Sequence, residues 1–168
     1  FSKSVPADRL IVGDVAFGKT EVIIRAAFLA AKSGIQSLIL VPTTLLSRQH
    51  YNNFSKRFNS FGINVREISR LISFKDKSKI LTSLERGEID VVIGTHALLS
   101  DKVHFKKLGL IIYDEEQKLG TNQKEKFKSI SPRAHVISLS ATPIPRTLSL
   151  SLSGIRDLSL ILTAPYER

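Results

Sequence analysis

Short apolar runs alternate with longer amphipathic segments along most of this 168-residue chain. The runs are nearly continuous in Val, Ile and Leu, which is typical of strands that are covered on both faces. Within one amphipathic segment, apolar or aromatic-ring residues recur every fourth position, as one buried helix face requires: Leu46, His50, Phe54 and Phe58. The pattern predicts strands at 10–15, 37–41, 64–68, 89–93, 108–113, 136–139 and 158–162, and helices at 19–33, 44–60, 75–86 and 123–130.

The alternation of strands and helices predicts the fold class. It is typical of a three-layer α/β domain, in which helices cover both faces of a mainly parallel sheet. A chain of this length holds one such domain, so we expect residues 1–168 to form a single unit. The chain starts at Phe1 and contains no methionine, and we therefore expect it to be a fragment of a larger protein.

Charge and composition narrow the range of partners. Lysine and arginine outnumber the acidic residues by 25 to 15, a net charge of +10, which favours a polyanion such as nucleic acid. The absence of cysteine excludes a disulfide framework and thiolate metal sites. No signal-peptide pattern and no apolar run of membrane-spanning length is present, so we expect a cytoplasmic protein.

A glycine-rich motif, GDVAFGKT at residues 13–20, lies between the first predicted strand and the first predicted helix. Gly13 and Gly18 allow the backbone to curl so that its N–H groups point at a phosphate chain, and the helix adds the positive end of its dipole. In this Walker A pattern Lys19 reaches the β- and γ-phosphates, and the Thr20 hydroxyl binds Mg²⁺. The motif predicts a nucleoside triphosphate site; the alternative is a turn without a ligand.

Two acidic residues follow another buried strand. In doubly wound sheets, ligands bind beyond the carboxyl ends of the strands. Asp114 comes directly after an apolar run and suits a Walker B role, holding Mg²⁺ through water. Glu115 would orient and deprotonate the attacking water. The alternative is an ordinary pair of surface acids.

Small polar residues end the other strands. Ser140 and Thr142 have short hydroxyls that can hydrogen-bond the two acids and a phosphate backbone, although a simple turn would have the same composition. Four further residues are candidates for contacts with nucleic-acid phosphates: Thr43, Thr44, Thr95 and His96. For each of these a helix cap or turn is the alternative, and Thr44 suits the N-cap of the next helix.

The order of the motifs resembles that of superfamily 2 helicases and translocases. GDVAFGKTE, PTTLLSRQH, GTHALL, DEEQ and SATPIPRTL resemble their motifs I, Ia, Ib, II and III. Phe17, the run TEVIIRAAF and the run SGIRDLSLI are similar to the bacterial transcription-repair coupling factors. RecG helicases share PT-x-x-L-x-x-QH, GTH and SATPIPRTL but differ at the P-loop and after the last motif.

The resemblance implies the first RecA-like lobe, a P-loop NTPase domain, of an ATP- and Mg²⁺-dependent translocase on double-stranded DNA. Coupling factors displace stalled RNA polymerase and recruit excision-repair proteins, which would bind other domains of the parent protein. By position in the motifs, nucleotide and Mg²⁺ would be bound by Gly13, Gly18, Lys19 and Thr20, and the Walker B pair would be Asp114 and Glu115. The coupling of nucleotide state to DNA contact would fall to Ser140 and Thr142. The residues near the DNA track would be Thr43, Thr44, Thr95 and His96.

Two positions depart from the family pattern. Glycine is usual where Ala16 stands, and a methyl group there is tolerable only at negative φ. Histidine is usual where Gln117 stands; Gln117 can still hydrogen-bond across to the Ser140 segment and contribute to the nucleotide site, but it carries no charge.

Two parts of the motor are not visible in the sequence. No adenine-reading segment precedes the P-loop, and no second lobe follows to supply an arginine finger worth ~10³ or more in rate. We therefore expect the isolated lobe to be nearly inactive. The alternatives that stay open are a RecG-like fork-remodelling helicase and a nucleotide-dependent interaction module without motor activity.

Overall fold

The computed structural model describes residues 6–14, 18–141 and 157–161. Within them, seven strands form one sheet in the order β3-β4-β2-β5-β6-β1-β7, and every neighbouring pair is parallel. The strands are β1 (Asp8–Gly13), β2 (Gln36–Leu40), β3 (Val65–Ile68), β4 (Val91–Gly94), β5 (Leu108–Tyr113), β6 (His135–Ser140) and β7 (Asp157–Ile161). The helices are α1 (Lys19–Lys32), α2 (Thr44–Phe58), α3 (Phe74–Arg86) and α4 (Thr121–Ile130), with short 3-10 turns η1 (Asn59–Phe61), η2 (His96–Leu99) and η3 (Glu116–Lys118).

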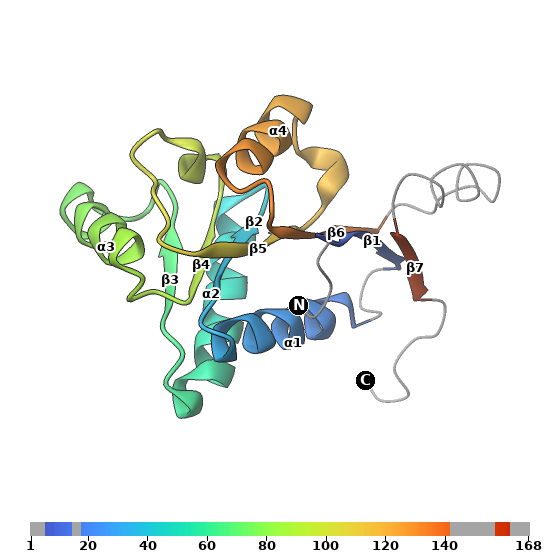
Figure 1. Ribbon diagram of the computed structural model, residues 1–168, viewed down its shortest axis with the longest axis horizontal. Coiled ribbons are helices and arrows are strands. Elements are labelled where there is room, and N and C mark those ends of the chain that lie inside the picture. The colour runs from blue at the N-terminus through green and yellow to red at the C-terminus, as the bar shows by residue number, and fades with distance from the viewer. Residues whose placement is uncertain (1–5, 15–17, 142–156, 162–168) are drawn as a thin grey trace.

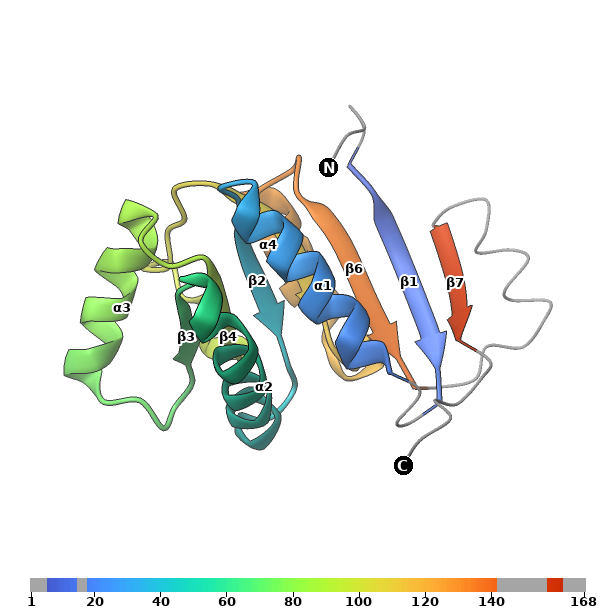
Figure 2. The ribbon, with the colours of Figure 1, turned by 90° about the horizontal axis from the view of Figure 1, so that it is seen from below.

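The sheet is the middle of three layers. Helices α1 and α4 lie on opposite sides of it (Figure 1), and α1 and α2 share one face (Figure 2). Strand β2 is buried at every position, with Ile39 in the core beneath α1 and α2 and Leu38 in the core beneath α3 and α4. Both faces need apolar side chains, which is why the strands read as continuous apolar runs. The predicted three-layer α/β class with a parallel sheet is confirmed.

Predicted and observed elements agree to within a few residues, and the differences have local causes. Helix α2 ends at Phe58 rather than at residue 60 because the chain tightens into η1 and then turns at Gly62, whose φ is +68°. Helix α3 begins at Phe74 because the Ser73 hydroxyl accepts a hydrogen bond from the Asp76 N–H. In α2, His50 and Phe54 are buried, as the every-fourth-residue pattern predicts.

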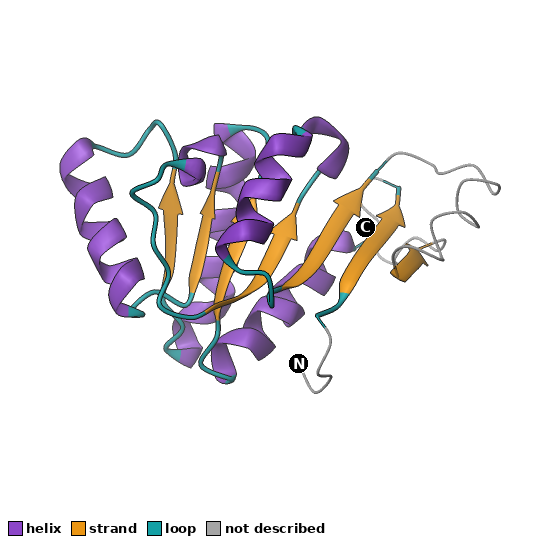
Figure 3. Cartoon of the chain, turned by 45° about the horizontal axis from the view of Figure 1, so that its top comes forward, coloured by secondary structure: helices purple, strands orange, loops and turns teal. Residues whose placement is uncertain are grey.

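All the strands point the same way, so their carboxyl ends meet at one edge of the sheet (Figure 3). The P-loop leaves β1, the two acids follow β5, and β6 lies between these two strands. The candidate DNA-contacting residues follow β2 and β4 on the other half of the same edge. The topology therefore brings sequence-distant motifs to one edge.

Candidate functional site

The P-loop joins β1 to α1. Gly13 packs so closely against β7 that an added Cβ would lie 3.0 Å from the Ile161 Cβ. Gly18 has φ +79°, a conformation that glycine adopts without the steric cost of a side chain. Helix α1 begins at Lys19, whose Nζ donates to the carbonyl oxygens of Gly13 and, at 2.9 Å, Asp14. The loop therefore sets an ammonium group beside a helix N-terminus.

This arrangement fits a phosphate chain. The two acceptors of Lys19 are neutral carbonyl oxygens, and ionised phosphate oxygens accept stronger hydrogen bonds from an ammonium group. Thr20 follows in the first turn of α1 and is partly buried. The loop residues 15–17, which include Ala16 and Phe17, lie outside the described residues, so the expectation for Ala16 is not tested.

A carboxylate in the first turn of α1 is neutralised by two arginines. Glu21 accepts from the Arg25 Nε at 3.0 Å and from Arg57 of α2. These hydrogen bonds, that of Arg25 first, hold the pKa of Glu21 below its usual value. The pairing ties α2 to α1 and limits the repulsion between this carboxylate and a phosphate chain bound at the loop.

Asp114 directly follows β5, and its side chain contacts a residue of α2. Its backbone N–H donates to the Leu40 carbonyl oxygen at 2.9 Å, which fixes the start of the turn. Its Oδ2 lies 2.7 Å from Nε2 of His50, which comes from α2. The side chain of Asp114 is 13% exposed and that of His50 is 7% exposed, so the pair is largely shielded from water. Sequence reasoning assigned His50 only to a buried helix face and missed this contact; a histidine inside an apolar stripe was the available signal.

Glu115 adopts a strained backbone conformation. Its φ is +55°, and it is the only non-glycine residue with positive φ in the described ranges. Left-handed geometry costs about 1–2 kcal/mol for such a residue. Its carboxylate accepts from the Gln117 amide nitrogen, and the Gln117 amide oxygen accepts from the Ser140 hydroxyl at 3.1 Å. The expected hydrogen bond from Gln117 across to the Ser140 segment is therefore present, whereas Thr142 lies outside the described residues.

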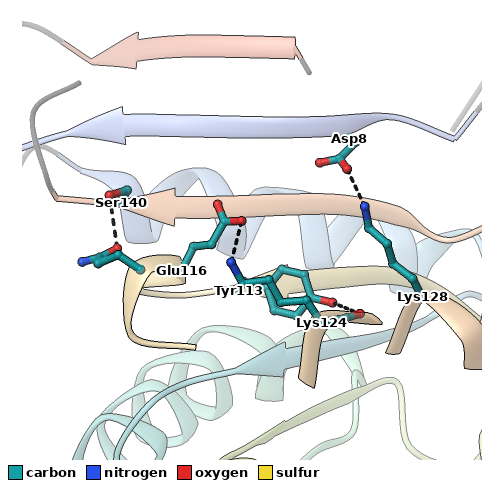
Figure 4. Close-up of polar contacts among 7 residues, drawn as sticks. Asp8, Tyr113, Glu116, Lys124, Lys128 and Ser140 are labelled. Atoms are coloured by element: carbon teal, nitrogen blue, oxygen red, sulfur yellow. Dashed lines mark hydrogen bonds and ion pairs between the residues drawn. The ribbon is translucent and has the colours of Figure 1, made fainter. Parts of the chain in front are cut away.

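The third acid of the motif contacts a helix instead. Glu116 accepts from the Lys124 Nζ at 3.0 Å, and the Tyr113 hydroxyl donates to the Lys124 carbonyl oxygen at 3.3 Å. Lys128 of α4 reaches Asp8 of β1 at 2.9 Å (Figure 4). These contacts hold α4 against the sheet, so Glu116 supports the packing of this layer.

The turn after β2 supplies the cap of α2. Thr43 has extended backbone geometry, and its hydroxyl accepts from the Leu46 N–H at 3.2 Å. Thr44 is the first helical residue. The prediction that Thr44 is the N-cap is therefore wrong by one residue, because the extended conformation that a cap needs falls on Thr43.

The turn after β4 is tightly packed. A Cβ on Gly94 would lie 2.2 Å from the Ile68 carbonyl oxygen, so the close approach of β3 requires glycine here. Thr95 is 2% exposed, and its hydroxyl has no hydrogen-bond partner in the part of the chain that the structure describes. His96 is exposed. Of the candidate DNA residues at this turn, His96 is thus accessible and Thr95 is enclosed.

Similarity to known proteins shows which family this chain belongs to. Residues 4–150 match the model of the DEAD/DEAH box helicases. The chain belongs to the DEAD/DEAH box helicase family. It is similar to the transcription-repair-coupling factors of Haemophilus influenzae, with 51% identity over 161 residues, and of Bacillus subtilis, with 51% over 163 residues. These matches cover 96% and 97% of the chain, which spans only 14% of the length of either relative.

A solved structure of RecG bound to a three-way DNA junction is also similar to this helicase-family chain. The TM-score is 0.81 with 38% identity, covering 97% of this chain and 22% of that one. The resemblance to superfamily 2 helicases, to the coupling factors and to RecG is confirmed. Membership of the helicase family implies ATP binding with a divalent metal ion. The position of Lys19 at the N-terminus of α1 suits the binding of phosphate groups.

The chain's own residues fit one divalent ion held together with nucleotide. Among the described residues, no group of three or more His, Asp or Glu side chains forms a ready-made metal site. Mg²⁺ in phosphoryl-transfer sites keeps several waters and takes one or two protein ligands besides phosphate oxygens. The hydroxyl of Thr20 and the carboxylate of Asp114 match that donor set. None of the described helices combines the length and the apolar character needed to cross a membrane.

Proposed function

We propose that this chain is the ATP-binding first RecA-like lobe, residues 1–168, of a cytoplasmic translocase on double-stranded DNA. The parent protein would displace stalled RNA polymerase and couple transcription to nucleotide excision repair. The observation that carries the proposal is the convergence of the P-loop lysine, Lys19, with Asp114 and Glu115 at one edge of a parallel sheet, where Gln117 bridges to Ser140.

The nucleotide site would divide its work among these residues. Lys19 would donate to the β- and γ-phosphates, and the N-terminus of α1 would favour their negative charge. Thr20 and Asp114 would hold Mg²⁺, which when bound neutralises charge on the phosphate oxygens. The Glu115 carboxylate would accept the proton of the attacking water.

Ser140, together with Thr142, would report the state of this site to the rest of the motor. The supporting contact is the chain of hydrogen bonds from Glu115 through Gln117 to Ser140. A change in the position of Glu115 would shift the end of β6 through that chain. Gln117 would thus form the link that a histidine forms at this position in the family pattern, although the glutamine amide carries no charge.

DNA would bind along the other half of the edge. The net charge of +10 and the accessible residues Thr43, Thr44 and His96 support backbone contact without base readout. Thr95, which is enclosed, would support the turn that presents His96. RNA polymerase and the excision-repair proteins would bind other domains of the parent protein.

The isolated lobe would be nearly inactive, because the second lobe supplies the arginine finger in such motors. A RecG-like fork-remodelling helicase is the second candidate, favoured by the similarity to the RecG structure. The higher identity to the coupling factors, 51% against 38%, supports the first. A nucleotide-dependent module without motor activity would bind ATP but show no DNA-stimulated turnover.

Calorimetric titration of the full-length protein with ATP and Mg²⁺ tests the nucleotide site. Lys19→Ala removes a charge-assisted hydrogen bond worth about 1.5–3 kcal/mol, so we expect the affinity to fall about ten-fold or more. Lys32→Ala, at the far end of the same helix, is the matched control and should bind as the parent does. Equal binding by the parent and Lys19→Ala would rule out the P-loop assignment.

A further inference from the structure

A buried imidazole contacts the proposed metal-binding carboxylate. The Nε2 of His50 lies 2.7 Å from Oδ2 of Asp114. An ionised carboxylate only accepts hydrogen bonds, so Nε2 carries the donated hydrogen. The other ring nitrogen, Nδ1, is buried without a hydrogen-bond partner among the residues that the structure describes. The polar contact of this ring is thus directed at Asp114.

The packing of α2 fixes the orientation of the ring. His50 meets Phe54 edge to face, with 6.2 Å between ring centroids and 79° between planes. Arg48, two residues earlier, pairs at 2.9 Å with Glu67 of β3, whose side chain is 2% exposed. Arg48 thus attaches the helix to the sheet before the imidazole, and Phe54, which packs in the core with Ile39, attaches it after the imidazole, so the ring has little freedom to turn away from the carboxylate.

We propose that His50 is a positioning residue that orients the Asp114 carboxylate for Mg²⁺. It engages one carboxylate oxygen and thereby sets the direction of the other. Partners of this kind orient metal-binding carboxylates, and their loss typically costs 10–100-fold in metal affinity or activity. The inference rests on the proposed function because it takes Asp114 as a metal ligand.

The same helix begins at the proposed DNA edge. Thr43 caps α2, and His50 lies in its second turn. A displacement of the helix N-terminus by a bound phosphate backbone would therefore move the imidazole, and with it the carboxylate.

Two substitutions in the full-length protein separate hydrogen bonding from packing. His50→Phe keeps an aromatic ring against Phe54 but removes the donor, and His50→Gln keeps an N–H donor without the ring. Ser47→Ala is the matched control, because Ser47 is fully buried on the same helix and its hydroxyl has no partner in the described part of the chain. A melting curve of each variant establishes that it is folded, and His50→Leu replaces His50→Phe should the latter fail to fold.

Two measurements report on the metal. One is the Mg²⁺ concentration that gives half-maximal ATP turnover, and the other is binding of Mn²⁺ in the presence of ADP, followed by electron paramagnetic resonance. We expect His50→Phe to raise both midpoints about ten-fold or more. His50→Gln should restore most of the loss, and Ser47→Ala should leave both midpoints where they are in the parent.

Unchanged midpoints in a folded His50→Phe variant would overturn the inference. An equal loss in His50→Phe and His50→Gln would also overturn it, because packing rather than the donated hydrogen bond would then explain the effect. A parent protein whose nucleotide binding does not depend on Lys19 would instead remove the proposed function. The Lys19→Ala titration is therefore run beside these variants.

Discussion

Polar side chains at the two halves of the sheet edge have different kinds of partner. After β5 and β6, they contact residues from other segments: Glu115 and Ser140 meet through Gln117, and Asp114 meets His50 from α2. After β2 and β4, the hydroxyls bond within their own turn or have no hydrogen-bond partner in the described part of the chain. The Thr43 hydroxyl caps the helix that follows it, and Thr95 is enclosed beside Gly94.

The difference matches the demands of two kinds of ligand. Phosphoryl transfer requires donors and acceptors held in one geometry before the reaction, and contacts between segments provide that rigidity. A DNA backbone repeats the same phosphate, so its contacts tolerate imprecise placement and can come from helix starts and exposed turns. The half proposed for nucleotide is thus held by contacts between segments, whereas the half proposed for DNA presents a helix cap at Thr43 and an exposed residue, His96.

The largest expected effect is that of removing the proposed base, Glu115. Glu115→Gln in the full-length protein should lower ATP turnover by about 10²-fold or more, since general-base catalysis contributes that much. Nucleotide affinity should persist, because Asp114 and Lys19 are unchanged. Phosphate release and calorimetry measure the two quantities.

The neighbouring acid is the control. Glu116→Gln loses a contact with Lys124 of α4 and should keep most of the turnover. Near-normal turnover in Glu115→Gln would exclude Glu115 as the base.

Two adjacent threonines differ in what they contribute to the start of α2. Thr43→Ala removes the N-cap of α2 and should cost about 1 kcal/mol. Backbone amides in the first turn of α2 should then exchange about five-fold faster with deuterated solvent, measured by mass spectrometry of the full-length protein. Thr44→Ala leaves the cap in place and should exchange much as the parent does; faster exchange in Thr44→Ala than in Thr43→Ala would contradict the observed cap.

The smallest expected effect is a loss of stability at acidic pH. It arises at the opposite end of the strands, where β6 begins. The Ala7 N–H donates to Nδ1 of His135 at 3.0 Å, and burial of the ring lowers its pKa below the usual 6.5. Below pH 6.5 the unfolded chain binds a proton that the folded protein does not, so stability falls as the pH drops from there toward the folded pKa.

Hydrogen exchange of β6 between pH 7.5 and 5.5, corrected for the intrinsic rate, measures this loss. We expect acidification to reduce the protection of β6 in the parent, and His135→Gln, which cannot titrate, to abolish that change. An equal loss of protection in both proteins would assign the pH dependence to other groups.

The sequence predicts most of the fold because its signals are local. Strands buried on both faces appear as continuous apolar runs, and the P-loop is a contiguous motif. The contact between His50 and Asp114 joins residues 64 positions apart and depends on how α2 lies across the sheet, which no local pattern specifies. The positive φ of Glu115 and the burial of Thr95 are likewise set by packing between segments.

The most direct test of a divided edge is ATP turnover by the full-length protein with and without duplex DNA over a salt series. The stimulation by DNA should fall steeply with salt and depend little on DNA sequence, because counterion release dominates backbone binding. Thr44→Ala and His96→Ala should reduce the stimulated rate more than the basal rate. If both rates fall together in these variants, the residues serve the fold or the nucleotide site, and the assignment of this half of the edge to DNA is wrong.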